Sequence, residues 1–367
     1  MAITTYALGD ALAVSLWARG LNREMRKGLS IAPLIGTGPN AIIQEKTEFK
    51  NAGDNVTVGL RMQLRGAGRT ENEVLEGIEE ALTTYSDKFY INELNHAVRV
   101  KGEDAIDTQR VNFDVRDEAR DAAADWFAER LSLWFFIQAS GYTASSMTYR
   151  GTSTTLSAVY RGNNTVTAPT SARKIYATGS ADETVNSAST AIMSLELLDY
   201  AKEEAVLANP KVRPIKIGGE NKYVCYLHPI QVTDLRTNTA TGQWLDIQRA
   251  ALMGGASSSN PIYTGALGEY NGIILRESED VVPGVHSSTA AEQTSTRRAL
   301  FLGAQAASIG FSSKFNKNSP FKWVEKTFDY DRELGVSVQG LAGLKRLDFN
   351  SQSIGAITIS TYAAAHS

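Results

Sequence analysis

The chain has 367 residues, of which 43% are apolar and 21% are charged, and its formal net charge is −3 at pH 7. This composition is typical of an ordered protein with room for one large domain or two ordinary ones, and it gives no overall basic field to attract nucleic-acid phosphates. One cysteine and four histidines exclude a disulfide framework and disfavour structural zinc, and no apolar run reaches the roughly 18 residues that span a bilayer.

Residues 1–40 are predicted to form an N-terminal arm. Apolar residues recur every four positions from Ala13 through Trp17 and Leu21 to Met25, which predicts one short amphipathic helix. The start of the chain lacks the basic residues of a secretory signal, so we expect a protein of a reducing cytoplasm or of a particle built there. An arm with one apolar face and no core of its own predicts docking on another subunit or domain, with Trp17 and Leu21 as candidate contacts.

Period-two patterns predict β-strands between residues 41 and 101. A run ending at Phe49, a turn at residues 51–55 and a second run over residues 56–64 predict a β-hairpin. A further strand is predicted over residues 88–100.

Residues 65–87, between the last two of these strands, are rich in glycine and glutamate. A loop of this length is uncommon inside a compact domain and is normally mobile or functional. Glutamates serve as metal ligands and general acids, but no histidine lies near them in sequence and the glycines indicate flexibility. An extended contact loop is therefore the favoured interpretation. Its candidate contact residues are Arg69, Glu71, Glu73, Glu76, Glu79 and Glu80.

Residues 107–141 carry the strongest helical pattern. Asp107 or Thr108 is the predicted N-terminal cap, and Gly141 is the predicted stop. The predicted apolar stripe consists of Val111, Val115, Ala119, Ala122, Trp126, Leu133 and Ile137. Such a helix is about 50 Å long. Its last third, LSLWFFIQA, is apolar nearly all round, which predicts burial. A strut half in a core and half on a surface predicts an extended, plate-like subunit, in which Trp126→Asp would bury an unpaired charge and prevent folding.

The next two regions differ in composition. Residues 142–189 are rich in Ser and Thr and predict an irregular, exposed insertion with one or two short strands. Residues 190–312 alternate between helical and strand patterns, which predicts an α+β or α/β domain that begins with a helix ended by Pro210. Within it, residues 281–297 are predicted to form an exposed loop. After it, residues 321–349 predict two or three strands, and the last nine residues are predicted to fray.

Few residues suggest catalysis. The sequence has no G-x-S-x-G, H-E-x-x-H, C-x-x-C or Walker pattern. His228 and Asp234 are candidates for a base and the group that orients it, but a histidine before a proline at a strand end more often caps or packs. Cys225 alternates with apolar neighbours, which indicates an inert core residue.

One set of carboxylates suggests a cation. Asp117, Asp121 and Asp125 share a helical face, and three like charges in a row are a possible site for a hard cation. Arginines lie nearby, so a solvated, salt-bridged face is the favoured interpretation. We therefore expect no catalytic residue, cofactor or metal, and a protein that acts through its surface and shape.

The amino-acid sequences of several segments resemble those of a known family. In chain order these segments are EFKNAGDNVTVGLRMQLRGAG, EGIEEALTTYSD, DVRDEARDAAADWFAERLSLWFF, YVCYLHPIQVTDLRT, GQWLDIQ and NPIYTGALGEYNGIILRES. Together they resemble the tailed-phage major capsid proteins, in the branch typified by the coat protein of coliphage N-four. The similarity runs from about residue 30 to residue 350 and is weakest over residues 142–188.

The resemblance implies a fold. It is the α+β fold of the Hong Kong 97 type, with an N-terminal arm, an E-loop hairpin, a long spine helix in a peripheral domain and an axial α/β domain. On this template the parts are the arm (1–40), the E-loop and its base strands (41–101), the spine helix (102–141), the Ser/Thr-rich insertion (142–189), the axial domain (190–312), and the peripheral return strands with the C-terminal tail (313–367).

The resemblance also implies a function. The chain would self-assemble as hexamers and pentamers into the icosahedral head shell that encloses the double-stranded DNA genome of a tailed bacteriophage. It would be assembled in the host bacterial cytoplasm and located in the virion. The implied partners are other copies of the chain, scaffolding, portal and decoration proteins, and packaged DNA bound without sequence specificity, with no membrane and no cofactor. Two alternatives are an encapsulin-type nanocompartment shell and a hydrolase that uses His228 and Asp234.

Overall fold

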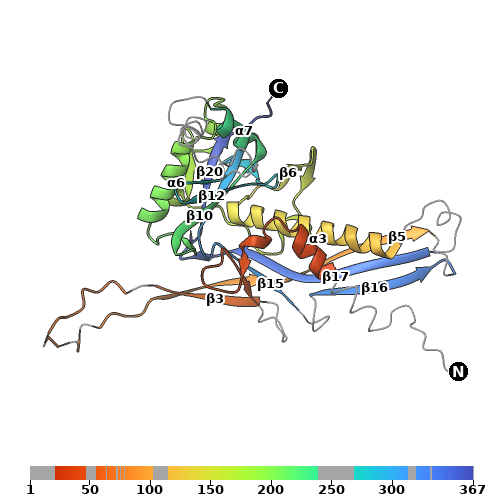
Figure 1. The fold of residues 1–367 in the computed structure, drawn as a ribbon, viewed down its shortest axis with the longest axis horizontal. Helices are drawn as coiled ribbons and strands as arrows, with labels where there is room; N and C mark the ends of the chain where they lie inside the picture. Colours follow the sequence, from red (N-terminus) through yellow and green to blue (C-terminus); the bar gives the residue numbers. More distant parts are fainter. Residues whose placement is uncertain are drawn as a thin grey trace.

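The computed structural model describes residues 21–46, 55–62, 64–71, 73–74, 76–77, 79–101, 115–238, 268–312, 320–330 and 333–366. Figure 1 shows an elongated subunit in which a long hairpin projects from one end. A flat layer of strands lies along a long helix, and a second domain stands on the other side of that helix. The predicted extended shape is therefore confirmed for the described residues.

The long helix is α3, Val115–Ser140. Its 26 residues give a length of about 39 Å at 1.5 Å per residue. The predicted caps Asp107 and Thr108 lie outside the described residues. The predicted burial of the C-terminal part is confirmed, because every residue from 131 to 142 is buried.

The end of α3 requires a glycine. Gly141 has φ +62°, and its N–H bonds to the carbonyl of Gln138 at 3.2 Å. The N–H of Tyr142 bonds to the carbonyl of Ile137 at 3.0 Å, which completes the bond pair of a glycine C-cap. A Cβ on Gly141 would lie 2.4 Å from the carbonyl oxygen of Thr167. The predicted stop is therefore confirmed, and both conformation and space demand glycine there.

The phase of the buried stripe differs from the prediction. Ala122 is exposed and Trp126 is half-buried, with its ring stacked on His96 at a centroid distance of 4.5 Å. The buried residues in this half of α3 are Ala119, Ala123, Ala124, Phe127, Ala128 and Leu131. An alanine run fits either phase, so the sequence did not fix it. Trp126 packs only partly against the main cluster, so Trp126→Asp stays a prediction with a weaker premise, and Ala123 and Phe127 are the positions where a carboxylate would be fully buried.

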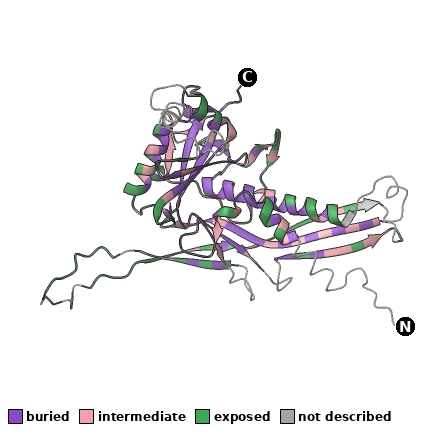
Figure 2. Ribbon diagram, viewed as in Figure 1, coloured by how far each residue is buried: buried purple, intermediate pink, exposed green. Residues whose placement is uncertain are grey.

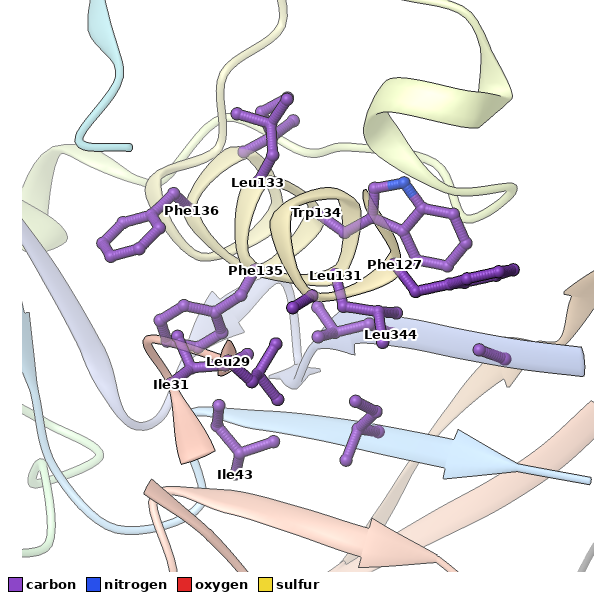
Figure 3. Packing of buried hydrophobic residues seen from close by; sticks show 14 of the residues in the cluster. Leu29, Ile31, Ile43, Phe127, Leu131, Leu133, Trp134, Phe135, Phe136 and Leu344 are labelled. Atoms are coloured by element: carbon purple, nitrogen blue, oxygen red, sulfur yellow. The ribbon is translucent and has the colours of Figure 1, made fainter. Parts of the chain in front are cut away.

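The last turns of α3 are buried because other segments of the chain pack against them on several sides. In Figure 3 Phe135 lies beside Leu29 and Ile31, whereas Leu133 and Trp134 point in other directions. All five side chains belong to one hydrophobic cluster that joins the two halves of the subunit. A helix surrounded in this way is apolar all round.

A six-stranded sheet lies under α3. Its order is β1-β2-β15-β17-β16, and the sixth strand, β5, also pairs antiparallel with β17. The strands are β1 (Ile35–Gly36), β2 (Ile43–Lys46), β5 (Asn92–Lys101), β15 (Ala307–Phe311), β16 (Phe321–Phe328) and β17 (Glu333–Arg346). Buried residues alternate along most of β17, as expected for a sheet with one covered face. The predicted return strands over residues 321–349 are confirmed.

The second domain is built on an eight-stranded mixed sheet. Its order is β11-β12-β10-β14-β20-β8, with β13 beside β14 and β9 beside β10. The strands are β8 (Lys174–Tyr176), β9 (Ile215–Ile217), β10 (Glu220–Leu227), β11 (Glu269–Tyr270), β12 (Ile273–Glu277), β13 (Pro283–Val285), β14 (Glu292–Leu302) and β20 (Ala356–Tyr362). The predicted helices are present as α6 (Leu195–Leu207) and α7 (Pro229–Thr237). Residues 242–254, whose apolar pattern also predicts a helix, lie outside the described residues.

Two segments predicted to be exposed are buried. Residues 281–285 pack in the interior as β13 and the chain before it, and the exposed loop is confined to the turn that follows. Residues 359–362, the first part of the segment predicted to fray, instead lie in β20, which pairs with both β14 and β8. Residues 363–366 follow this strand, and Ala365 and His366 are exposed. Ile357 and Ile359 of β20 are fully buried. Pairing on both edges gives this strand the burial that its terminal position did not predict.

The Ser/Thr-rich region is folded rather than irregular. Its elements are β6 (Ser146–Tyr149), β7 (Thr152–Thr155), α4 (Ala158–Arg161), η2 (Ser171–Arg173), β8 and α5 (Asp182–Asn186). The predicted short strands are confirmed, but the polar residues Asn164, Arg173 and Asp182 are buried. The Asn164 amide bonds to the N–H of Tyr90 at 2.7 Å and to the carbonyl of Leu344 at 3.1 Å. Polar residues here hold the helix and the two sheets together.

Candidate functional site

The projecting hairpin consists of β3, Asn55–Arg61, and β4, Thr84–Tyr90, which pair antiparallel along seven residues of each strand. The sequence predicted a hairpin between the run ending at Phe49 and the run after it, but residues 47–54, which hold Phe49 and most of the predicted turn, lie outside the described residues. The described part of the earlier run is β2, which pairs with β1 and β15 in the sheet under α3 and not with β3. The strand predicted over residues 88–100 is divided at Ile91 between β4 and β5.

Residues 62–83, here called the acidic loop, connect β3 to β4. Figure 2 shows the loop exposed along its course. Of its described residues only Met62 is even half-buried, and Leu64, Val74 and Leu82 are 58%, 69% and 56% exposed. An isolated two-stranded ribbon is at best marginally stable in water. Exposed apolar residues on such a ribbon indicate a surface that another chain covers. The sequence analysis did not select these three residues, although apolar side chains in a polar segment are a visible signal.

The glutamates of the acidic loop partly order its backbone. The Glu80 carboxylate accepts the N–H groups of Arg65 at 2.8 Å and Gly66 at 2.6 Å. These two bonds, that of Arg65 first, lower the pKa of Glu80. Arg69 pairs with Glu73 at 3.2 Å. The predicted contact residues Arg69, Glu71, Glu73, Glu76, Glu79 and Glu80 are all exposed on this loop.

The base of the hairpin is fixed to the body of the subunit. A separate hydrophobic cluster joins the two strands to the chain after β17, and it consists of Val56, Val58, Phe89, Leu347, Phe349 and Ile354. Farther out, the Arg65 guanidinium donates to the side-chain oxygen of Asn209 at 2.5 Å. A groove of about 470 Å³ runs between the stem and residues 208–213. These contacts set the direction in which the acidic loop leaves the subunit.

The predicted contacts of the arm differ in their placement. Leu21 is fully buried in the hydrophobic cluster of its own chain, together with Met25. Trp17 lies outside the described residues. The structure therefore places Leu21 in an intrachain contact, in which the arm docks on its own subunit.

The candidate catalytic pair is not assembled. His228 caps α7, because its Nδ1 accepts the N–H of Ile230 at 3.3 Å and its own N–H donates to Gln231 at 2.9 Å. Burial, followed by the charge of Arg297, lowers the pKa of His228 to about 4. Asp234 pairs instead with His366 at 3.3 Å. The favoured interpretation of His228 as a capping residue is confirmed.

The other candidates also have structural roles. Cys225 is fully buried in an apolar strand, and burial raises its pKa to about 12, so the thiolate nucleophile is absent at neutral pH. Arg120 bridges Asp117 at 3.1 Å and Asp121 at 2.9 Å, as expected for a salt-bridged face. No cluster of three or more His, Cys, Asp or Glu suited to a metal occurs in the described part of the chain. No described helix is long and apolar enough to cross a membrane.

Known proteins resemble this chain along its length. A family model described as phage capsid protein matches residues 5–365. The capsid of Ralstonia phage GP4 is 31% identical, has a TM-score of 0.77 and covers 100% of both chains. The major capsid protein of Pseudomonas phage KPP25 is 27% identical over 374 residues, which cover 96% of this chain and 95% of that protein. The capsid of cyanophage Pam1 has the same fold at 20% identity, with a TM-score of 0.69 and 94% of each chain covered.

The family match covers nearly the whole chain, and the structural matches include both sheets, the long helix and the hairpin. The fold implied by the sequence resemblance is confirmed, and the nanocompartment and hydrolase alternatives are not favoured. The chain belongs to the phage capsid protein family, has the Hong Kong 97-type fold and is a major capsid protein of a phage.

Proposed function

We propose that this chain forms the icosahedral head shell of a tailed phage, as hexamers and pentamers around a double-stranded DNA genome. The observation that carries the proposal is the acidic loop, which projects from the body with its apolar side chains uncovered. A rigidly based projection with exposed Leu64, Val74 and Leu82 stabilises an assembly by burying them on a neighbouring copy. This role is structural and needs no catalytic group or cofactor.

The charges on the long helix support one orientation of the subunit relative to the packaged DNA. Asp117, Glu118, Asp121 and Asp125 are exposed on the outer face of α3. We infer that this acidic face is directed toward the packaged DNA, because like charge keeps the genome from adhering to the shell. Scaffolding, portal and decoration proteins are the further partners proposed for a shell assembled in the host bacterial cytoplasm.

Electron microscopy of particles purified from infected cells tests this proposal. We expect closed icosahedral shells that contain double-stranded DNA. Particles of the same protein that contain an enzyme and no DNA would instead support a nanocompartment.

Removing the acidic loop tests its role in assembly. Deletion of residues 66–80 should leave a folded subunit, because the cluster at the base of the hairpin remains, but it should abolish shell formation. Circular dichroism reports folding, and sedimentation velocity reports assembly. Normal shells from the deletion variant would contradict the contact role.

A control variant distinguishes the effect of the loop's length and apolar side chains from the effect of its charge. A variant of full length with Glu71, Glu73, Glu76 and Glu79 changed to Gln keeps the exposed apolar side chains. We expect it to assemble, with a weaker dependence on salt than the wild type, because screening acts on exposed charges.

A further inference from the structure

A cavity of about 200 Å³ lies where three parts of the subunit meet. Its walls come from α3, from the β6–β7 hairpin and from the segment of the second domain that precedes β13. Here the peripheral layer, which consists of α3 and the six-stranded sheet under it, meets the second domain on the side away from the acidic loop. Any change in the angle between the two domains changes the contacts around this cavity.

The α3 side of the junction is held by an ion-pair chain. Glu129 of α3 accepts a hydrogen bond from the hydroxyl of Tyr149 and pairs with Arg150 at 3.5 Å. Arg150, at the turn of the β6–β7 hairpin, lies 3.9 Å from Glu279 of the second domain. One arginine therefore connects all three parts.

A second arginine has unused donors. The guanidinium of Arg130 lies 4.3 Å from the ring centre of Tyr160 and 5.6 Å from that of Tyr149. Its Nε and Nη1 atoms are buried and have no hydrogen-bond partner among the described residues. Donors buried without a partner are costly, so this arrangement is sensitive to the charges around it.

Asp280 is a half-buried acid that lines the cavity. Glu129 and Arg130 face it from α3, Tyr149 and Arg150 from the hairpin, and Glu279 from its own segment. His228 and Arg297 line the same cavity. Burial, followed by the charges of Glu279 and Glu129, raises the pKa of Asp280 to about 6, against the opposing effect of the two arginines. The pKa of His228 is lowered to about 4, so this histidine stays neutral when Asp280 titrates.

We propose that Asp280 is a proton-operated switch between the peripheral layer and the second domain. When it is protonated, the segment before β13 carries one negative charge fewer beside Glu129 and Glu279, and the junction stays closed. When ionised, Asp280 places a third carboxylate beside Glu129 and Glu279, and the junction opens more often. The shell subunit would then have a tighter hinge in mildly acidic solution than in neutral solution.

The direction follows from the two states of Asp280. Its pKa is raised in the closed junction, whereas an opened, hydrated junction restores the ordinary value of 3.8. The closed state therefore binds the proton more tightly, and its extra stability is present below pH 3.8 and is lost as the pH rises through about 6. Between pH 5.0 and pH 7.5 these two pKa values correspond to about a tenfold increase in the opening constant.

Hydrogen exchange on the full-length protein measures this opening. After correction for intrinsic exchange rates, the amides of residues 146–155 and 278–285 should be about tenfold less protected at pH 7.5 than at pH 5.0. The isosteric variant Asp280→Asn should show the same protection at both values. Equal protection of the wild type, or a pH dependence that survives in Asp280→Asn, would overturn the proposal.

Two further variants distinguish a switch from a merely structural residue. Arg150→Gln removes a cation that opposes the raised pKa of Asp280, so the midpoint of the pH dependence should move up. Glu279→Gln, at a side chain that is 78% exposed, removes an anion and should move the midpoint down. A midpoint unchanged in both variants would show that another group titrates. These readings are made on the subunit itself, so they do not depend on the proposed head-shell architecture.

Discussion

Ala123→Asp is expected to yield no folded subunit, whereas Ala122→Asp should fold and assemble. The two alanines are neighbours on α3, but Ala123 is 5% exposed in the main hydrophobic cluster and Ala122 faces solvent. A carboxylate at position 123 would be buried among apolar side chains, at a cost of several kcal/mol. Such a loss is a large part of the roughly 5–15 kcal/mol by which domains are stable.

The matched substitution makes the test specific to the phase of the helix. Both variants lose the same helix propensity and add the same charge, so they differ only in burial. Ala122→Asp should cost about 0.5–1 kcal/mol, from propensity and repulsion by nearby carboxylates. Soluble yield and far-ultraviolet circular dichroism provide the measurement. A folded Ala123→Asp variant, or an unfolded Ala122→Asp variant, would contradict the observed packing.

Asp182→Asn should destabilise the subunit by about 3–5 kcal/mol, because it leaves the charge of Arg298 buried without a counterion. The Asp182 carboxylate accepts Arg298 Nε at 2.8 Å and Nη2 at 2.6 Å, and both side chains are at most 5% exposed. It also accepts the N–H of Val285 at 2.8 Å. Arg298 in turn donates to the carbonyl of Gly141 at 3.2 Å. One ion pair thus connects the insertion, β13, β14 and the end of α3.

An exposed ion pair provides the control. Asp117→Asn removes one partner of Arg120 on the solvent face of α3, where the Asp117 side chain is 53% exposed, and should cost less than about 1 kcal/mol. Urea unfolding of the unassembled subunit, followed by tryptophan fluorescence, gives both values. Equal losses in the two variants would mean that the buried pair does not hold the domains together.

The sequence predicted the elements whose signals are local. The glycine stop at residue 141, the apolar run after Leu131 and the strand alternation over residues 321–349 each specify a backbone conformation or a burial pattern within a few residues. The acidic loop was found in the same way, from its length between two strand patterns and from its glycines. For these elements the chain needs no distant partner to reveal its conformation.

Other features depended on residues far away in the chain. β2 was assigned to the wrong partner because its apolar pattern fits any neighbouring strand, and β15, which is its actual partner, lies more than 250 residues later. The last strand, β20, was predicted to fray because nothing in its sequence identifies β14 and β8 as the strands on its two edges. The Ser/Thr-rich insertion looked irregular because its order comes from single polar side chains such as Asn164 and Asp182.

The sequence by itself determined the family, the periodicities and the presence of a long helix and an exposed acidic loop. Only the tertiary structure decided which face of α3 is buried, which strands are paired and which polar side chains lie in the interior. The physical reason is that a periodic pattern specifies the apolar face of a helix or strand but not the residues that pack against that face. The free energy that selects one arrangement comes from apolar contacts and buried ion pairs between residues distant in sequence.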